Sequence, residues 1–467
     1  MRLLLLSLLL VFPLAAGAQS WTFDGNFPAD EDRQFSSTHG IAVDGEGRIW
    51  VQPFGLADSV SVADTVRASG TVLVFNPDGS EADCSPIRFL SNESGTVTDT
   101  LGIGTNAAGN LETQTGRGLT ADKDGDILIT QGSLLFKVDH TSCGDGDDDA
   151  GDSDDNTVVL LAKAQPFTGS MTAAGTDDDG NFYVTAVVAN ETAPIVQLGP
   201  DLTEIARFGT TRTFNRAVLA SPDGRAVWDF SYTTRQPVVY YREDEFADFD
   251  SLGVTPRGMA IESATIQPVT GWYWFSAGSP ADPPNQDPAV ETNWRANTWY
   301  AFAEEDLFTF DGDGNITGVV EVPTPRDSIT WADPATPGRP RAIAFSADGE
   351  TAYVGQFSQP APATQRFVKR DTPTENGPQR TWVALDQNAP NPTAGRTEIA
   401  FSLERAGHAR LAVFDVTGRE VARLVDGPMA AGDHAATLDA GQFAPGVYLY
   451  TLQVDDQRAT RRMVVVR

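Results

Sequence analysis

The chain has 467 residues and a formal net charge of −31 at pH 7. This length suggests two or three domains and is sufficient to bury a large core. The negative charge disfavours nucleic acid and anionic membrane surfaces as general partners, because like charges repel. Lysine occurs only at positions 123, 137, 163 and 369. An acidic, lysine-poor surface fits either a salt-adapted protein or an ordinary soluble secreted one.

The N-terminus has the pattern of a secretory signal peptide. Arg2 precedes a short apolar run at residues 3–12, and the small residues Ala16-Gly17-Ala18 follow it. The run is too short to cross a bilayer comfortably. The pattern predicts a signal peptide at residues 1–18, a mature chain that begins at Gln19, and no transmembrane segment.

A weak repeat runs through residues 39–355. Its unit is a short strand of small and β-branched residues, a turn rich in Asp and Gly, and a second strand; the six copies begin near residues 40, 118, 172, 217, 258 and 342. Asp-Gly pairs supply the positive φ that tight hairpin turns need. A second hairpin follows each unit, and two hairpins form a four-stranded antiparallel sheet. We therefore predict an all-β chain in which residues 19–370 form a six-bladed β-propeller.

The spacing of the copies leaves the blade number open. The third to fifth copies follow one another at about one blade length, whereas two other gaps are about twice as long. Six blades with insertions at residues 55–69, 91–115 and 278–298 are the prediction, and seven blades are the alternative. The strand–turn–strand pattern resembles the NHL and SMP-30-like propellers. His39-Gly40 stands where the lactonases of that superfamily carry an acidic metal ligand, so the resemblance implies the fold and not lactonase activity.

The residue before the first strand is basic in five of the six units, and Ser170 stands at this position in the third. A propeller would place these residues in one ring at a mouth of its channel, where guanidinium groups suit carboxylates, sulfates and phosphates. We predict a site for an anionic small molecule or glycan, with the histidine contributing below about pH 6.5. The alternative is that each arginine pairs with an aspartate of the neighbouring blade. The predicted ligand-binding residues are His39, Arg117, Arg216, Arg257 and Arg341.

Two further features concern metals and redox chemistry. Residues 145–155 contain seven aspartates, and oxygen ligands at alternating positions suit Ca²⁺; a solvated acidic loop is the alternative. Cys84 and Cys143 could pair if the protein is exported. No nucleophile motif or phosphate-binding loop occurs, so an enzyme is less favoured than a binding protein. The candidate calcium ligands are Asp145, Asp147, Asp149, Asp152 and Asp154.

Residues 386–467 have alternating apolar residues typical of about seven strands, which predicts a small Ig-like β-sandwich. This segment resembles the type A sorting domain of the type IX secretion system, also called the Por secretion domain. The resemblance implies passage through the periplasm, recognition by the outer-membrane translocon, and secretion or attachment at the cell surface. Residues 371–385 have the composition of a linker. The motif residues that carry the resemblance are Asn391, Pro392, Asp415, Gly418, Arg419, Gly446 and Tyr448.

Together these features predict an exported β-propeller protein that binds an anionic small molecule, a glycan or a protein. Two other functions are compatible with the sequence: a hydrolase or lyase that acts at the propeller channel, and a scaffold for protein–protein interactions.

Overall fold

The computed structural model describes residues 21–466, apart from residues 32–33, 55–57, 63–64, 106–110, 144–155, 188–193, 213, 232–235, 279–293, 313–314, 334–337, 358–361, 370–382, 386–387, 392, 404–406, 416–418, 445 and 455–456. The predicted signal peptide lies outside the described residues. The chain divides into two compact units, unit 1 (Met1–Arg370) and unit 2 (Asp371–Arg467).

Strands make up nearly all the regular structure of the described residues, which confirms the all-β prediction. Helix is limited there to one turn, α2 (Glu304–Leu307), and two 3₁₀ turns, η2 (His140–Ser142) and η3 (Ala440–Gln442). In the part of the chain that is described, no helix is long and apolar enough to cross a membrane.

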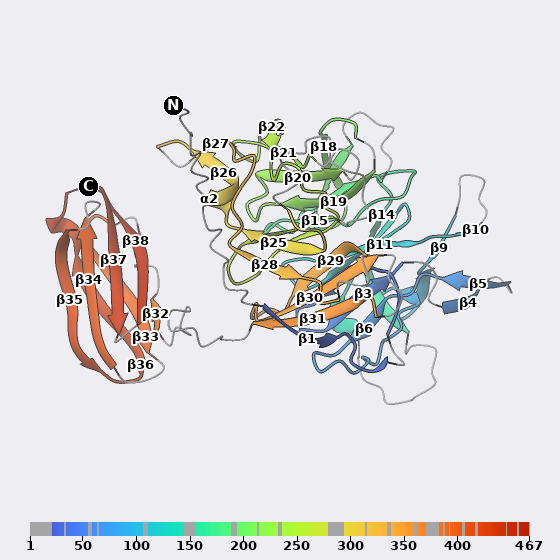
Figure 1. Cartoon of the computed structure of the whole chain (residues 1–467), viewed down its shortest axis with the longest axis horizontal. Helices are drawn as coiled ribbons and strands as arrows, with labels where there is room; N and C mark the ends of the chain where they lie inside the picture. The colour runs from blue at the N-terminus through green and yellow to red at the C-terminus, as the bar shows by residue number, and fades with distance from the viewer. Residues whose placement is uncertain are drawn as a thin grey trace, which may run out of the picture. The chain divides into compact units, whose positions relative to one another are not determined.

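Unit 1 contains six sheets of three or more strands among its described residues, and we call these sheets blades (Figure 1). The first blade comprises β2 (Thr38–Val43), β3 (Ile49–Pro53) and β6 (Leu73–Phe75). The second comprises β11 (Gly116–Ala121), β12 (Ile127–Gln131), β13 (Leu134–Val138) and β14 (Thr157–Ala164), and it is extended by β7 (Phe89–Ser91) and β8 (Val97–Thr100). The third comprises β15 (Gly175–Thr176), β16 (Phe182–Thr185), β17 (Ile195–Leu198) and β18 (Glu204–Phe208). The fourth blade comprises β19 (Asn215–Ala220), β20 (Ala226–Ser231), β21 (Val238–Tyr241) and β22 (Asp250–Val254). The fifth comprises β23 (Ala264–Ile266), β24 (Tyr273–Ser276), β25 (Thr298–Phe302) and β28 (Asp327–Thr330). The sixth comprises β29 (Arg339–Phe345), β30 (Thr351–Phe357), β31 (Thr364–Lys369) and β1 (Trp21–Asn26).

Three separate hairpins extend from the blades. They are β4 (Asp58–Val62) with β5 (Thr65–Ser69), β9 (Ile103–Thr105) with β10 (Leu111–Thr113), and β26 (Phe308–Phe310) with β27 (Ile316–Val319). The first two lie within segments predicted as insertions, and residues 279–293 of the third predicted insertion lie outside the described residues.

A polar side chain closes the first turn of every blade. In the first blade, Oδ1 of Asp44 accepts hydrogen bonds from the backbone N–H groups of Glu46 (3.0 Å) and Arg48 (2.8 Å). Asp122, Asp177, Ser221, Gln267 and Ser346 accept backbone hydrogen bonds in the other five turns. Short polar side chains of this kind favour turns because they replace backbone partners. The repeated Asp of the sequence is therefore a local folding signal.

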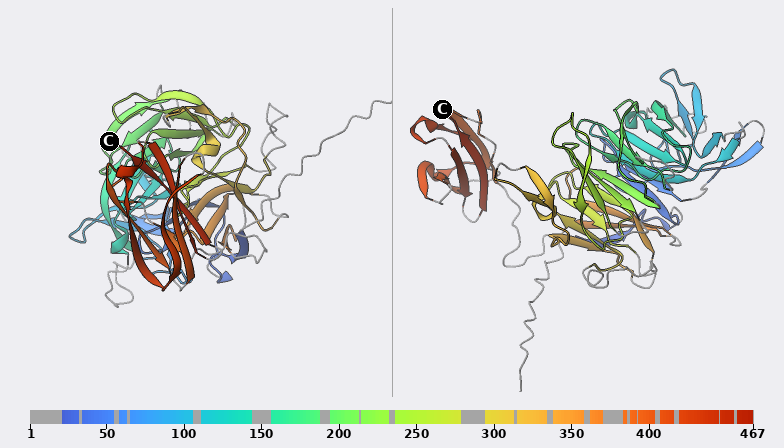
Figure 2. Two further views of the ribbon diagram at one scale, coloured as in Figure 1. Left: turned by 90° about the vertical axis from the view of Figure 1, so that its left-hand side faces the viewer. Right: turned by 90° about the horizontal axis from the view of Figure 1, so that it is seen from above.

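The blades follow one another in a cyclic order of contacts. Among the first strands, β2 contacts β11 and β29, β15 contacts β11 and β19, and β23 contacts β19 and β29. A hydrophobic cluster fills each interface, and the one between the sixth and first blades joins Ile41 and Val51 to Ala342 and Tyr353. In Figures 1 and 2 the colours change in chain order around unit 1. The blue strand β1 returns to pair with the orange β31, so the first described strand completes the last blade.

The two cysteines, whose pairing the sequence left open, form a disulfide. Cys84 lies between β6 and β7, and Cys143 follows η2. Nearby, the Arg48 guanidinium donates hydrogen bonds to the backbone carbonyls of His140 and Cys143. These contacts fasten the first blade to the second at their turn ends.

The fifth repeat copy does not have the strand predicted at residues 258–261. The first strand of the fifth blade is β23, which begins at Ala264 and pairs with β24. Met259 and Ile261 are nevertheless buried in the cluster shared with the fourth blade. Their apolar pattern was therefore a signal of the core and not of a strand.

Unit 2 contains seven strands in two sheets within its described residues. One sheet has the order β32 (Val383–Leu385), β33 (Arg396–Leu403), β36 (Gly432–Asp439), and the other β35 (Glu420–Met429), β34 (Gly407–Asp415), β37 (Gly446–Val454), β38 (Gln457–Val465). Ile399 and Phe401 of the first sheet are buried together with Leu411 and Tyr450 of the second, so the sheets pack face to face as a β-sandwich. Residues 383–385 of the predicted linker belong to this sandwich, and residues 371–382 lie outside the described part.

Candidate functional site

Four of the five predicted basic residues occupy β-bulges in the first strands of their blades. The pairing of β2 with β3 shifts its register at His39. The first strands β11, β19 and β29 shift at Arg117, Arg216 and Arg341. A bulged residue has no direct partner on the neighbouring strand, and its side chain is aimed differently from those of the regular strand. The repeat therefore presents these four side chains at equivalent places in four blades.

A constant spacing identifies the equivalent residues of the other two blades. Each bulged residue lies five positions before the polar residue that closes the first turn, as His39 lies before Asp44. The same spacing from Asp177 and Gln267 leads to Thr172 in the third blade and Glu262 in the fifth. Thr172 replaces the predicted Ser170. We call the six equivalent residues the inner ring: His39, Arg117, Thr172, Arg216, Glu262 and Arg341.

The charged members of the inner ring interact across the blades. The charges of Arg117, Arg216 and Arg341 all act on His39. Arg216 also acts on Arg117, and both act on Arg341. Interactions between charges weaken with distance. These four side chains, from the first, second, fourth and sixth blades, therefore lie near one another.

Glu262 provides the single carboxylate of the inner ring. Its Oε2 lies 2.8 Å from Nε of Arg341, and the two residues are only 1% and 8% exposed. Burial lowers the pKa of Arg341 to about 10, while Glu262 acts in the opposite direction. The two side chains therefore form a buried ion pair between the fifth and sixth blades. The predicted alternative was an aspartate of the neighbouring blade for each arginine, and for Arg341 a glutamate of the fifth blade takes that place.

Two aromatic rings, Phe54 and Phe357, contact members of the inner ring. The imidazole of His39 contacts Phe54 and Phe357, with ring centroids 4.7 and 5.1 Å away. The guanidinium of Arg117 lies 5.6 Å from the centroid of Phe54, and that of Arg341 lies 5.3 Å from the centroid of Phe357. A cation over the face of an aromatic ring makes a favourable contact.

The surroundings of His39 oppose the protonation that was predicted for it below about pH 6.5. Burial lowers the pKa of His39 well below 6.5, and the three guanidiniums lower it further. An interaction with the backbone of Gly116 opposes these effects without overcoming them. Neither ring nitrogen makes a well-formed hydrogen bond, although the residue is only 4% exposed. His39 is thus a neutral, buried imidazole inside a cationic ring.

Arg257 lies apart from the inner ring. Its Nη1 is 2.7 Å from Oε2 of Glu321, and the pair is exposed. The prediction assumed that residue 257 directly precedes a first strand, whereas β23 begins at Ala264. Glu262 was missed for the same reason. The five-residue spacing to the turn could have revealed it, because that spacing is present in the sequence.

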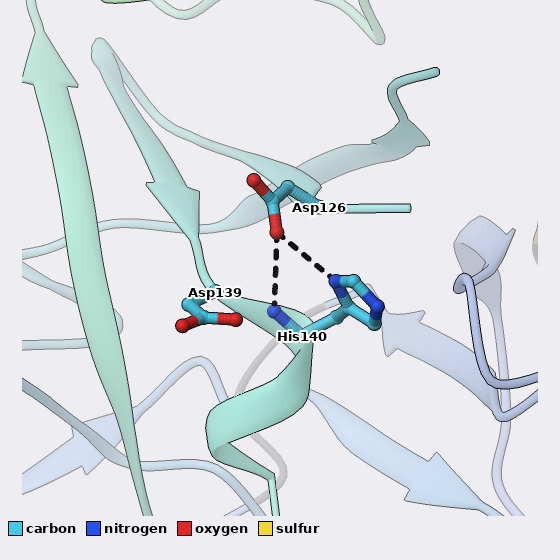
Figure 3. Close-up of side chains that lie close together, drawn as sticks. All are labelled: Asp126, Asp139 and His140. Carbon is cyan, nitrogen blue, oxygen red and sulfur yellow. Dashed lines mark hydrogen bonds and ion pairs between the residues drawn. The ribbon is translucent and has the colours of Figure 1, made fainter. Parts of the chain in front are cut away.

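The predicted calcium ligands Asp145, Asp147, Asp149, Asp152 and Asp154 lie outside the described residues, and calcium binding there stays a prediction. The described part does contain a compact group, Asp126, Asp139 and His140, whose ligand atoms lie within 4.8 Å of one another (Figure 3).

Local contacts already account for the group in Figure 3. Oδ1 of Asp126 lies 3.0 Å from Nδ1 of His140, and its Oδ2 lies 3.7 Å from Nζ of Lys137. Asp139 accepts hydrogen bonds from the backbone and the hydroxyl of Thr141. A metal ion would compete with the lysine and the imidazole for these oxygens. The arrangement resembles a structural hydrogen-bond network more than a metal centre.

Asp229 is a buried carboxylate outside the ring that could suggest acid–base catalysis. It lies in β20 and is fully buried, and its Oδ2 lies 3.8 Å from Nε of Arg212. Burial raises the pKa of Asp229 to about 6. Such a perturbation is common at active sites but also occurs in structural ion pairs. No nucleophile motif accompanies Asp229 in the sequence.

The residues of the sorting motif have structural roles in unit 2. Oδ1 of Asn391 accepts a hydrogen bond from Val464 N (2.8 Å), and the hydroxyl of Tyr448 donates to the carbonyl of Ala444 (2.9 Å). The remaining motif residues are distributed as follows: Asp415 ends β34, Gly446 begins β37 with φ +156°, Arg419 precedes β35, and Pro392 and Gly418 lie outside the described residues.

Among solved structures that align with the chain, the extracellular domain of a one-component system from B. thetaiotaomicron is 11% identical, with a TM-score of 0.35, covering 92% of this chain and 50% of that one. PorZ, a surface component of the type IX secretion system of Porphyromonas gingivalis, is 12% identical, with a TM-score of 0.36, covering 91% and 59%. A luciferin-regenerating enzyme is 10% identical, with a TM-score of 0.39, covering 74% and 94%. The chain thus spans about half to three fifths of the length of the first two. These TM-scores are too low to support an argument about activity or ligand.

No curated protein matches the chain. Residues 389–466 match the family described as the secretion system C-terminal sorting domain, and this match coincides with the sandwich of unit 2. The resemblance to NHL and SMP-30-like propellers is not confirmed by a family match and stays a prediction for unit 1. The C-terminal unit is therefore a type IX secretion system sorting domain, and the protein is a cargo of that system, exported to the cell surface or secreted.

Proposed function

We propose that the exported cargo is a six-bladed β-propeller whose inner ring binds an anionic ligand. The cyclic contacts of the first strands and the hydrophobic cluster between the sixth and first blades support the propeller. In a propeller the first strands surround the axis, so equivalent residues of these strands face a common space.

The observation that carries the proposal is the collection of cationic groups in a strongly acidic chain. The inner ring combines the guanidiniums of Arg117, Arg216 and Arg341 with one carboxylate, although the chain as a whole has a net charge of −31. The Nε atom of Arg117 is buried without a hydrogen-bond partner among the described residues, and neither ring nitrogen of His39 makes a well-formed hydrogen bond there. Buried polar groups nearly always have partners, so a ligand or ordered water is expected to complete the site.

Binding without turnover fits the described residues better than a hydrolase or lyase activity does. The carboxylate of Glu262 is held against Arg341, and His39 is buried between two aromatic rings. Neither has the exposed position next to a nucleophile that a general base needs. A protein scaffold would not require the residues of the inner ring. Substitution of these residues therefore distinguishes a scaffold from an anion-binding protein.

The test is anion binding by the mature full-length chain, measured by calorimetry with glucuronate, glucose 6-phosphate and inorganic sulfate. We expect at least one of these probes to bind, and R117Q combined with R216Q to weaken it about ten- to hundredfold. R257Q removes the same charge from an exposed pair outside the ring and serves as the matched control. Binding that survives the double substitution, or an equal loss in R257Q, would contradict the proposal.

A further inference from the structure

We infer that Glu262 sets the charge of the inner ring, so that the site selects one carboxylate with neighbouring hydroxyl groups, as in a uronic acid, over a doubly charged phosphate. This inference rests on the proposed function and specifies the ligand class of the same site. Three observations support it: the pairing of Arg341, the environment of Arg117, and the neutral state of His39.

The first observation is that the guanidinium of Arg341 is already paired with a carboxylate. Arg341 and Glu262 approach to 2.8 Å, and both side chains are almost completely buried. Charges held this close in a weakly polarisable interior cancel each other at the distance of a ligand. The carboxylate belongs to the fifth blade, where an arginine was expected from the repeat. The net charge offered to a ligand is correspondingly lower than that of a ring of basic residues.

The second observation concerns the geometry of Arg117. The described residues provide no carboxylate partner for this side chain, which is half-buried and lies over the face of Phe54. A guanidinium held over a ring can still use its N–H groups for hydrogen bonding, and the buried Nε of Arg117 has no partner among the described residues. Two parallel N–H groups of a guanidinium match the two oxygens of a planar carboxylate. Arg216 adds positive charge nearby, as its effect on Arg117 shows.

The third observation is the neutral imidazole of His39. It adds no charge to the site, and its two nitrogens are buried without well-formed hydrogen bonds. In the neutral form one nitrogen donates and the other accepts. A hydroxyl group can also do both, whereas a carboxylate or a phosphate dianion can only accept. A ligand that places a hydroxyl beside its carboxylate therefore satisfies both His39 and Arg117, and uronic acids have this composition.

The experiment compares glucuronate with glucose 6-phosphate, which carry a carboxylate and a phosphate at the same end of one sugar, with glucose as the uncharged probe. The wild-type mature chain is expected to bind glucuronate at least about tenfold more tightly than glucose 6-phosphate, and not to bind glucose measurably. E262Q keeps the shape of the side chain and removes its charge. It should strengthen glucose 6-phosphate binding about tenfold and reduce or reverse the preference.

E321Q removes the carboxylate paired with Arg257 outside the ring and is the matched control, for which no change is expected with either sugar. Thermal unfolding of E262Q verifies that the variant is folded. If E262Q is folded and its preference equals that of the wild type, the inference is overturned. Equal or tighter wild-type binding of glucose 6-phosphate overturns it as well. In both cases the proposed anion site stands as long as R117Q combined with R216Q weakens binding about ten- to hundredfold.

Discussion

The two ends of the first strands in unit 1 carry repeated polar residues of opposite character. At the turn end, Asp44 accepts hydrogen bonds from two backbone N–H groups, and its Oδ2 accepts from Trp50 Nε1 and Arg48 Nε, both at 2.8 Å. At the bulge end, five residues earlier, His39 has no well-formed hydrogen bond. At the turn end of β2 the hydrogen-bonding groups of the side chain thus have partners, whereas at the bulge end they make no well-formed hydrogen bond.

This difference separates repetition that serves folding from repetition that serves a site. A side chain whose hydrogen-bonding capacity is filled by its own turn has none left for a ligand. The imidazole of His39, which is aimed by a bulge and makes no well-formed hydrogen bond, does not stabilise its blade in the same way. Substitutions at the turn end should therefore change stability, and those at the bulge end should mainly change binding.

The largest expected effect is the loss of Asp44. D44A removes four accepted hydrogen bonds and the buried carboxylate beside Arg48, which keeps the exposed carboxylate of Glu46 at 3.2 Å, and it should lower the free energy of unfolding by about 3–5 kcal/mol. Chemical denaturation of the mature chain measures this. D348A removes an exposed aspartate from the turn of the sixth blade and should change stability by less than about 1 kcal/mol. Equal effects of the two substitutions would contradict a special role for the buried network.

A second effect concerns the disulfide that joins the first two blades near their turn ends. Cys84 and Cys143 are separated by 59 positions, and opening a loop of this length is expected to lower stability by about 2–4 kcal/mol. C84A combined with C143A should show this loss in denaturation, while the folded variant keeps the anion affinity of the wild type. A loss of affinity without a loss of stability would link the disulfide to the bulge end instead.

The smallest expected effect is a pH dependence at the bulge end. His39 is neutral in the folded chain at pH values where the unfolded chain binds a proton, because folding lowers its pKa. Stability should therefore fall as pH decreases below about 6.5, by up to about 1.4 kcal/mol per pH unit. H39Q removes this contribution, so the difference in unfolding free energy between wild type and H39Q, measured at pH 7.5 and 5.5, should change in favour of H39Q. A difference that stays constant with pH would mean that His39 titrates normally in the folded chain.

Much of the fold could be predicted because its signals are local. The turn residues Asp122 and Asp177 close hairpins by hydrogen bonds within five residues of sequence. The alternating strands of the sorting domain likewise identify themselves over short segments. The candidate site was predictable only in part. The positions of Arg117, Arg216 and Arg341 follow from the repeat, whereas the fifth position was assigned to Arg257 because an apolar segment resembled a strand.

The sequence by itself determined the all-β class, the repeated strand–turn–strand unit, the basic residues of four blades and the sorting domain, because each depends on residues close together in the chain. Only the tertiary structure decided that β1 completes the sixth blade, that Glu262 rather than Arg257 belongs to the inner ring, and that His39 is neutral. These three features depend on strands from distant parts of the chain meeting in space. Burial and the charges of other blades act on a residue through those contacts, and no local pattern in the sequence records them.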